Sequence, residues 1–110
     1  MKSLNRIQLV GWLGNDPEFV TLKDGTQMAR MRLATDIFIP QQQGPPKKIT
    51  SWHTVKLWSQ AHVKRIKDYL IKGSHILVEG RLEYRTYEDK TGHTRYVTEI
   101  NASYLVDLDR

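Results

Sequence analysis

The sequence contains no cysteine, and this absence removes several kinds of chemistry at once. Disulfide bonds, thiolate nucleophiles and zinc sites built on sulfur are all excluded. Long apolar runs are also lacking, since no stretch approaches the ~20 apolar residues of a membrane span and residues 1–6 contain no secretory apolar core. We therefore expect a cytoplasmic protein that does not enter the membrane and is stabilised by packing or oligomerisation.

Histidine is scarce as well, with four residues that are dispersed along the chain without the spacing of metal ligands. We expect no metal site and no cofactor. The 110 residues suffice for one domain with a single core and are too few for two. Lysine and arginine number 17 against 12 aspartates and glutamates, for a net charge of +5. This surplus favours polyanionic partners, although charge alone does not separate a nucleic-acid binder from an ordinary basic domain.

Alternation of apolar and polar residues predicts five strands. They are expected at residues 6–13, 27–36, 50–58, 74–84 and 94–106. An extended region precedes the second strand and turns at Asp24-Gly25, a pair typical of hairpins. A single helix is expected to begin at Ser59 and to end near Leu70, with Val63 and Ile66 on its buried side.

This order predicts an all-β protein with one helix, namely an OB-fold: a five-stranded antiparallel Greek-key barrel with its helix between the third and fourth strands. Such barrels commonly bind oligonucleotides or oligosaccharides, and the fold alone does not decide between them. Residues 39–49 are rich in proline, glutamine and glycine, so we expect a mobile loop there. Residues 1–110 should otherwise form one domain.

Alternation also places aromatic and basic side chains on shared outward faces. Trp52, Lys56 and Trp58 lie on one side of the third predicted strand, and Arg30 and Arg32 lie together on the second. Unpaired DNA exposes base faces and phosphates, so a sequence-tolerant binder needs aromatic platforms beside a basic groove. The alternatives are a second core or subunit contact for the tryptophans, and an ordinary solvated strand face for the arginines.

Loops and hairpin arms carry further basic residues that could close on a bound strand, although each is equally explained as a solubilising charge. They are Lys47, Lys48, Arg85, Lys90 and Arg95. Trp12 points outward from the first predicted strand. It is consistent either with stacking on a base or with a subunit contact.

Several segments, taken in order, resemble the bacterial single-stranded DNA-binding protein family. A Gly-x-Leu-Gly-x-Asp-Pro-Glu run is followed at the right distances by Trp-His and Lys-Gly-Ser, a highly specific combination. The matching segments lie at residues 5–18, 33–35, 51–53, 69–74 and 78–82. The resemblance implies an OB-fold that binds and protects single-stranded DNA in replication, recombination and repair.

The resemblance also implies roles for individual residues. Trp52 matches a base-stacking tryptophan, Trp58 stands where a stacking aromatic is found, and Tyr87 stands where relatives often carry another tryptophan. Phe38 lies near the position of the remaining stacking residue. The family forms tetramers, so a homotetramer is expected, with His53 matching a position close to subunit contacts.

Family members also recruit replication and repair proteins through an acidic tail that ends in Ile-Pro-Phe. In the last six residues of this sequence, 105–110, two aspartates alternate with apolar residues before Arg110. These residues do not form such a tail, so we expect either a truncated chain or a natural short form that protects DNA without recruiting replication and repair proteins by that route.

Two other functions compete with DNA binding. A metal-dependent nuclease would need converging carboxylates, and the available set is Glu83, Glu88, Asp89 and Glu99. These residues surround a basic hairpin, where cross-strand charge pairing explains them equally well, so no enzyme is expected. A primosome-type OB module that recruits proteins and binds DNA weakly is the other alternative, and the set of stacking residues argues against it.

Overall fold

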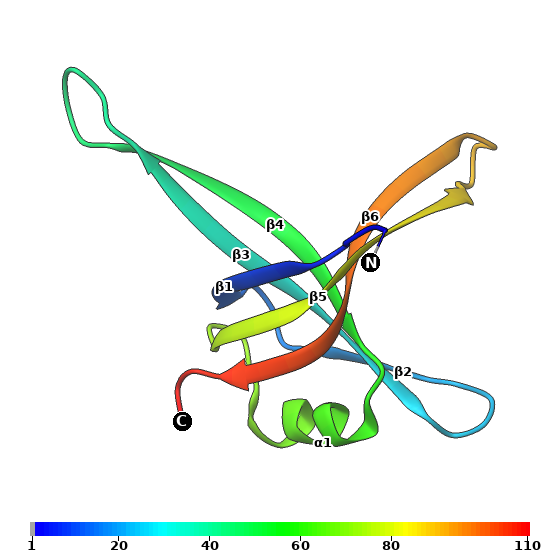
Figure 1. The fold of residues 1–110 in the computed structure, drawn as a ribbon. Helices are drawn as coiled ribbons and strands as arrows, with labels where there is room; N and C mark the ends of the chain where they lie inside the picture. Colours follow the sequence, from blue (N-terminus) through cyan, green and yellow to red (C-terminus); the bar gives the residue numbers. More distant parts are fainter. Residues whose placement is uncertain (1) are drawn as a thin grey trace.

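Strands with alternating burial form most of the protein, and the computed structural model describes residues 2–110 (Figure 1). Within that range the elements are β1 (Ile7–Leu13), β2 (Glu18–Thr21), β3 (Gln27–Ile39), β4 (Lys47–Leu57), α1 (Gln60–Tyr69), β5 (His75–Glu88) and β6 (Thr94–Asp107). Each predicted strand and the predicted helix are present. The extended region before the second predicted strand forms β2, which turns into β3 through Gly25 at a φ of 90°.

The sheet closes into a barrel because β1 pairs with both β5 and β3. The ring runs β1, β5, β6, β4, β3 and back to β1, while β2 is added outside the ring on β3. This arrangement matches the predicted five-stranded OB-fold with its helix between the third and fourth barrel strands. A ring with an odd number of strands cannot alternate in direction at every contact. One pair, β4 with β6, is therefore parallel, which corrects the expectation of a wholly antiparallel barrel.

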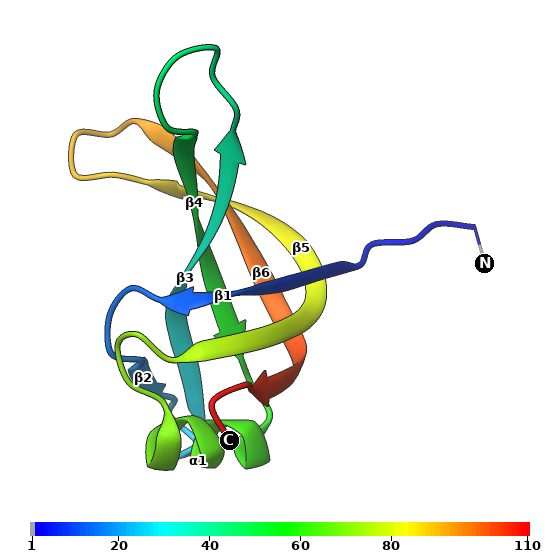
Figure 2. The same ribbon diagram turned by 90° about the vertical axis from the view of Figure 1, so that its left-hand side faces the viewer.

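The core lies inside this ring and is closed at one end by the helix (Figure 2). Leu33, Val55 and Ile76 from three different strands are fully buried. Val63 and Ile66 of α1 pack against the same cluster, as the helical spacing predicts. Full burial of such a side chain contributes about 1.5–3 kcal/mol. The inward faces of the strands are thus occupied by the core, and any ligand must bind on the outward faces.

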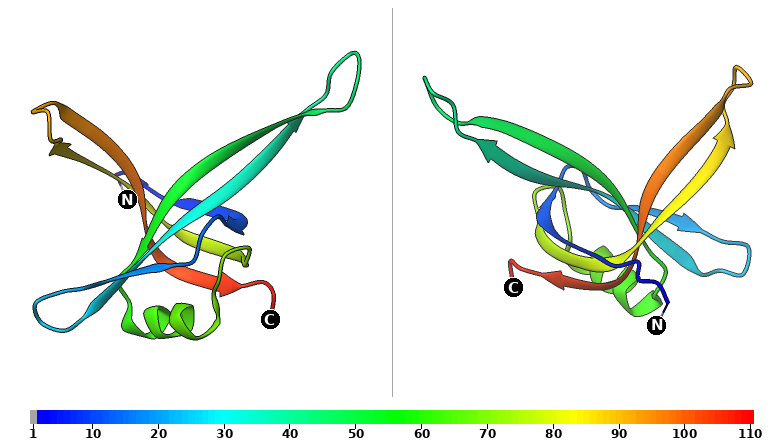
Figure 3. Two further views of the ribbon diagram at one scale, coloured as in Figure 1. Left: turned by 180° about the vertical axis from the view of Figure 1, so that it is seen from behind. Right: turned by 45° about the horizontal axis from the view of Figure 1, so that its top comes forward.

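Two long hairpins, β3–β4 and β5–β6, extend beyond the barrel as arms that diverge from each other (Figure 3). Pairing in the first arm continues to Ile39 opposite Lys47, so the segment without strand structure covers residues 40–46 and is shorter than the predicted loop. The predicted loop was too long because the prolines were taken to interrupt the strands on both sides. They lie only within the tip, and the isoleucines on either side favour strand pairing.

Candidate nucleic-acid interface

One outward face of β3 and β4 brings together the central candidates. Cross-strand pairs place Trp52 opposite Ala34 and Arg30 opposite Lys56. The Trp52 side chain is 52% exposed, and the guanidinium carbon of Arg32 lies 5.6 Å from the centre of its ring. That geometry is a cation–π contact, which holds a positive charge beside an open aromatic face. Arg30 and Arg32 make no ion pair with any carboxylate in the described part of the chain.

The position of the Trp52 ring depends on Gly14, the second glycine of the Gly-x-Leu-Gly run, for which the sequence predicted no contact with Trp52. A Cβ atom placed on Gly14 would lie 2.3 Å from Cζ3 and 2.6 Å from Cη2 of Trp52. The indole therefore lies directly against the Gly14 backbone, in space that any other residue would fill. In the sequence, a glycine just after a strand indicates only a turn, so this contact had no sequence signal.

Trp58 directly follows the last residue of β4 and precedes α1, six residues after Trp52. Its side chain is 42% exposed, and its carbonyl oxygen accepts a hydrogen bond of 2.9 Å from Nε2 of Gln60. Six residues of extended strand separate the two indoles, which corresponds to about 20 Å. The two platforms are thus exposed as predicted but do not contact each other.

Lys56 lies between the tryptophans, yet its charge is used within the protein. Its Nζ atom is 3.4 Å from Oε1 of Glu99 and 3.9 Å from Oε2 of Glu83, and the side chain is only 14% exposed. Nε of Arg85 also donates to Oε1 of Glu99, at 2.6 Å. Glu99 is 2% exposed, and the Arg85 hydrogen bond and the Lys56 charge lower its pKa despite the opposing effect of burial. This geometry favours a structural role for Lys56 over the predicted contact with phosphate.

The β5–β6 arm presents an aromatic and basic face of its own. Tyr87 lies opposite Arg95, and the Arg85 guanidinium carbon lies 5.8 Å from the centre of the Tyr87 ring. Arg95 donates to Oδ2 of Asp89 at 2.8 Å. Hydrogen bonds from Thr91 and from Arg95 lower the pKa of Asp89 to about 2. The predicted residues do come together here, with their positive charges partly balanced by carboxylates.

The β3–β4 arm divides its two predicted lysines between opposite faces. Phe38 pairs with Lys48, and the unbroken register keeps both on the same face of the ribbon as Trp52. Phe38 is 64% exposed, so it extends the aromatic surface outward along the arm. Lys47 pairs with Ile39 and lies on the other face. Of the two lysines, only Lys48 shares the surface that contains Trp52.

His53 points away from that surface, toward the interior side of β4. It is half-buried, and its Nε2 lies 2.9 Å from Oγ1 of Thr35. Burial lowers the pKa of His53, which favours the neutral ring. A role at a subunit contact stays a prediction.

Basic side chains neutralise the carboxylates considered for a nuclease, including Glu83 and Glu99, which lie opposite each other on β5 and β6 and share Lys56. Glu83 pairs with Arg81 at 2.8 Å, Glu99 with Arg85, and Asp89 with Arg95. Within residues 2–110 no group of three or more histidine, aspartate or glutamate side chains is arranged to hold a metal ion. Over the same residues, no helix is both long enough and apolar enough to span a membrane.

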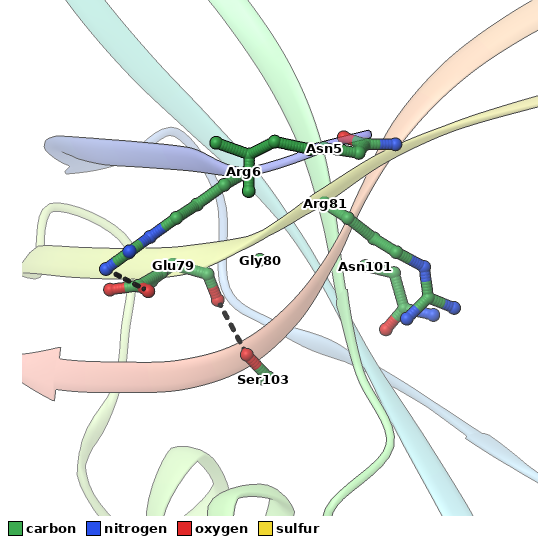
Figure 4. A pocket seen from close by; sticks show the side chains of 8 residues that line it. Asn5, Arg6, Glu79, Gly80, Arg81, Asn101 and Ser103 are labelled. Atoms are coloured by element: carbon green, nitrogen blue, oxygen red, sulfur yellow. Dashed lines mark hydrogen bonds and ion pairs between the residues drawn. The ribbon is translucent and has the colours of Figure 1, made fainter. Parts of the chain in front are cut away.

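A separate hollow of about 280 Å³ lies between residues 4–6, which precede β1, and the strands β5 and β6 (Figure 4). Its charged side chains already have partners: Arg6 binds Glu79 at 2.7 Å, and Arg81 binds Glu83. None of the predicted stacking residues lines it. The hollow therefore does not compete with the face around Trp52 as a nucleic-acid site.

Together, the closed barrel and the aromatic and basic face of β3 and β4 define an OB-fold protein of the oligonucleotide-binding type. Residues 4–108 match the model of the single-strand binding protein family. The chain belongs to this family.

Two relatives illustrate the match. The chain is 35% identical over 99 residues to a single-stranded DNA-binding protein of Rhizobium meliloti (strain 1021), with 89% of this chain and 57% of the relative aligned. The chain thus spans less than two thirds of that relative's length. It is also similar to the structure described as a Plasmodium falciparum SSB complex with ssDNA. That comparison has a TM-score of 0.88 and 34% identity, and covers 99% of this chain and 98% of the other.

Proposed function

We propose that this protein binds single-stranded DNA without sequence preference and protects it. The observation that carries the proposal is the exposed Trp52 indole beside Arg32, on a face that also bears Arg30. Every base has a flat face that can stack on an indole, and every nucleotide has a phosphate that can pair with an arginine. The combination accepts any sequence but requires that the bases be unpaired.

In this proposal, four aromatic side chains stack on bases and separate cations contact the backbone. Trp52, Trp58, Phe38 and Tyr87 are exposed by 42–64% and lie on β4, at its end, and on the two arms. Each stacked base is worth about 1–3 kcal/mol. The backbone contacts come from Arg30, Arg32 and Lys48, with smaller contributions from Arg85 and Arg95, which already have carboxylate partners.

The proposal assigns binding and no catalysis to this chain. The carboxylates near the β5–β6 arm neutralise arginine and lysine side chains, so they are not available together for a catalytic cation. Replication, recombination and repair in the cytoplasm expose unpaired strands, and we place the protein in those processes.

A homotetramer is part of the same proposal. One OB barrel covers only ~4–16 nucleotides, so several copies are a natural way to hold a longer strand. An apolar outward face on β1, β5 and β6 supports self-association: Val10 pairs with Leu77, which pairs with Val106. Val10 is 47% exposed in the single chain, so burying it against another copy would be favourable.

Titration with an oligothymidylate of about 35 nucleotides tests the proposed function. Bases that stack on Trp52 and Trp58 should quench the tryptophan fluorescence strongly, and the signal should saturate at low concentration. Weak binding that does not saturate would instead favour the OB module that recruits proteins and binds DNA poorly.

A further inference from the structure

Trp12 forms an ordered aromatic pair that the proposed stacking set does not include. It lies on β1 directly opposite His75, the first residue of β5. The two ring centres are 4.5 Å apart and the ring planes differ by 9°, so the rings are stacked face to face. Trp12 is nevertheless 48% exposed. His75 thus covers one side of the indole and leaves much of the ring open to solvent.

The pair lies next to Trp52. Trp12 is the cross-strand partner of Ala34, and Ala34 is the cross-strand partner of Trp52, so the three residues form one row on the outward face. Neighbouring strands are about 4.8 Å apart, which places Trp12 and Trp52 roughly 10 Å apart across the small alanine.

The Trp52 ring reduces this separation further. It lies over Gly14, which follows Trp12 by two residues. Two residues of extended chain span about 7 Å. The two indoles therefore lie close enough for one DNA strand to pass over both.

We propose that Trp12, supported by His75, is a further base-stacking platform that binds a nucleobase of the same single strand. This inference rests on the proposed function. A strand stacked on Trp52 continues across β1 toward β5, in addition to any path along β4 toward Trp58. The apolar face around Val10 and Leu77 adjoins Trp12, because Val10 is two residues away on the same outward side of β1, so the oligomeric state of each Trp12 variant has to be measured together with its affinity.

Substitution of Trp12 in the full chain tests the inference, with a labelled oligothymidylate of about 35 nucleotides as the probe and fluorescence anisotropy as the readout. Trp12→Ala should weaken binding by about 5- to 150-fold, the range for one lost base stack. Trp12→Phe, which keeps a flat ring, should stay within about fivefold of the wild type. Tyr96→Ala is the matched control, because Tyr96 is 82% exposed and lies on the face of the β5–β6 arm away from Tyr87; it should bind like the wild type.

His75 provides a second test, because a supporting ring acts only through the ring that it supports. His75→Ala should weaken binding less than Trp12→Ala, and should have no further effect in a chain that already carries Trp12→Ala. Independent losses in this double-mutant cycle would contradict the supporting role.

Size-exclusion chromatography with light scattering separates the inference from its alternatives. Trp12→Ala should keep the wild-type oligomeric state and thermal unfolding midpoint while losing affinity. Unchanged affinity, or a loss of affinity that accompanies a changed oligomeric state, would overturn the stacking role of Trp12. If the wild-type chain itself failed to bind the probe, the proposed function would be wrong. That result differs from a Trp12→Ala variant that binds as tightly as the wild type, which would overturn only the role of Trp12.

Discussion

Replacing Gly14 by alanine should move the Trp52 ring and weaken binding of single-stranded DNA without unfolding the barrel. The new Cβ would lie 2.3 Å from one ring carbon and 2.6 Å from the next, whereas carbon atoms in contact are about 3.5–4.0 Å apart. The ring must therefore shift by more than about 1 Å or change rotamer. Leaving a preferred rotamer costs about 0.5–1.5 kcal/mol, which sets the expected loss of stability.

The loss of affinity has a separate limit. A displaced indole can lose at most the worth of its base stack, about 1–3 kcal/mol, which is roughly 5- to 150-fold in dissociation constant. We expect Gly14→Ala to fall within that range. Urea unfolding measures the stability, and anisotropy of a labelled oligothymidylate measures the affinity at one fixed salt concentration.

The matched control is the same substitution in a chain that already carries Trp52→Ala. Without the indole there is nothing for the new methyl group to displace, so Gly14→Ala should then change neither affinity nor stability appreciably. Equal effects of Gly14→Ala with and without Trp52 would refute the reasoning, because they would show that the glycine matters for its own backbone.

Three further predictions follow from the site. Trp52→Ala and Trp58→Ala should each weaken single-strand binding by about 1–3 kcal/mol in the same anisotropy assay, with circular dichroism unchanged. Arg32→Ala should reduce the slope of log affinity against log salt by about 0.7, because one phosphate contact is lost. Lys56→Ala should leave that slope unchanged. It should instead lower the free energy of unfolding by about 1–3 kcal/mol, because buried Glu99 loses a cation. The folded-state pKa of Glu99 lies below its ordinary value of 4.5, so its contribution to stability is present above that pH and is lost as the pH falls through the lowered pKa. Urea midpoints from about pH 7 to about pH 3 should therefore decrease less in Glu99→Gln than in the wild type.

The barrel could be predicted because its strands keep strict alternation between core and solvent. Leu33, Val55 and Ile76 each lie inward at the expected phase, and the helix between β4 and β5 buries Val63 and Ile66. Such local periodicity is visible in a sequence. The parallel β4–β6 pair was missed because it follows from ring closure, which no single segment reveals.

For the candidate site, the sequence predicted which face of a strand each residue occupies, but not which residues it contacts. Alternation correctly placed Trp52 and Arg32 outward, and the structure brings them into contact. The role of Lys56 could not be judged in the same way, because Glu99 approaches it from a strand more than 40 residues later in the chain. The contacts that Gly14 and His75 make were missed for the same reason, since their partners Trp52 and Trp12 become neighbours only after folding.

Competition between single-stranded and duplex DNA tests the central claim most directly. Stacked and paired bases offer no open faces to the indoles, so duplex DNA can be held only by the weaker electrostatic contacts. With a labelled oligothymidylate already bound at physiological salt, an equal nucleotide concentration of duplex should leave nearly all of it bound, whereas unlabelled single strand should displace it. Displacement by duplex as effective as displacement by single strand would contradict the account, because it would show that phosphates alone are recognised.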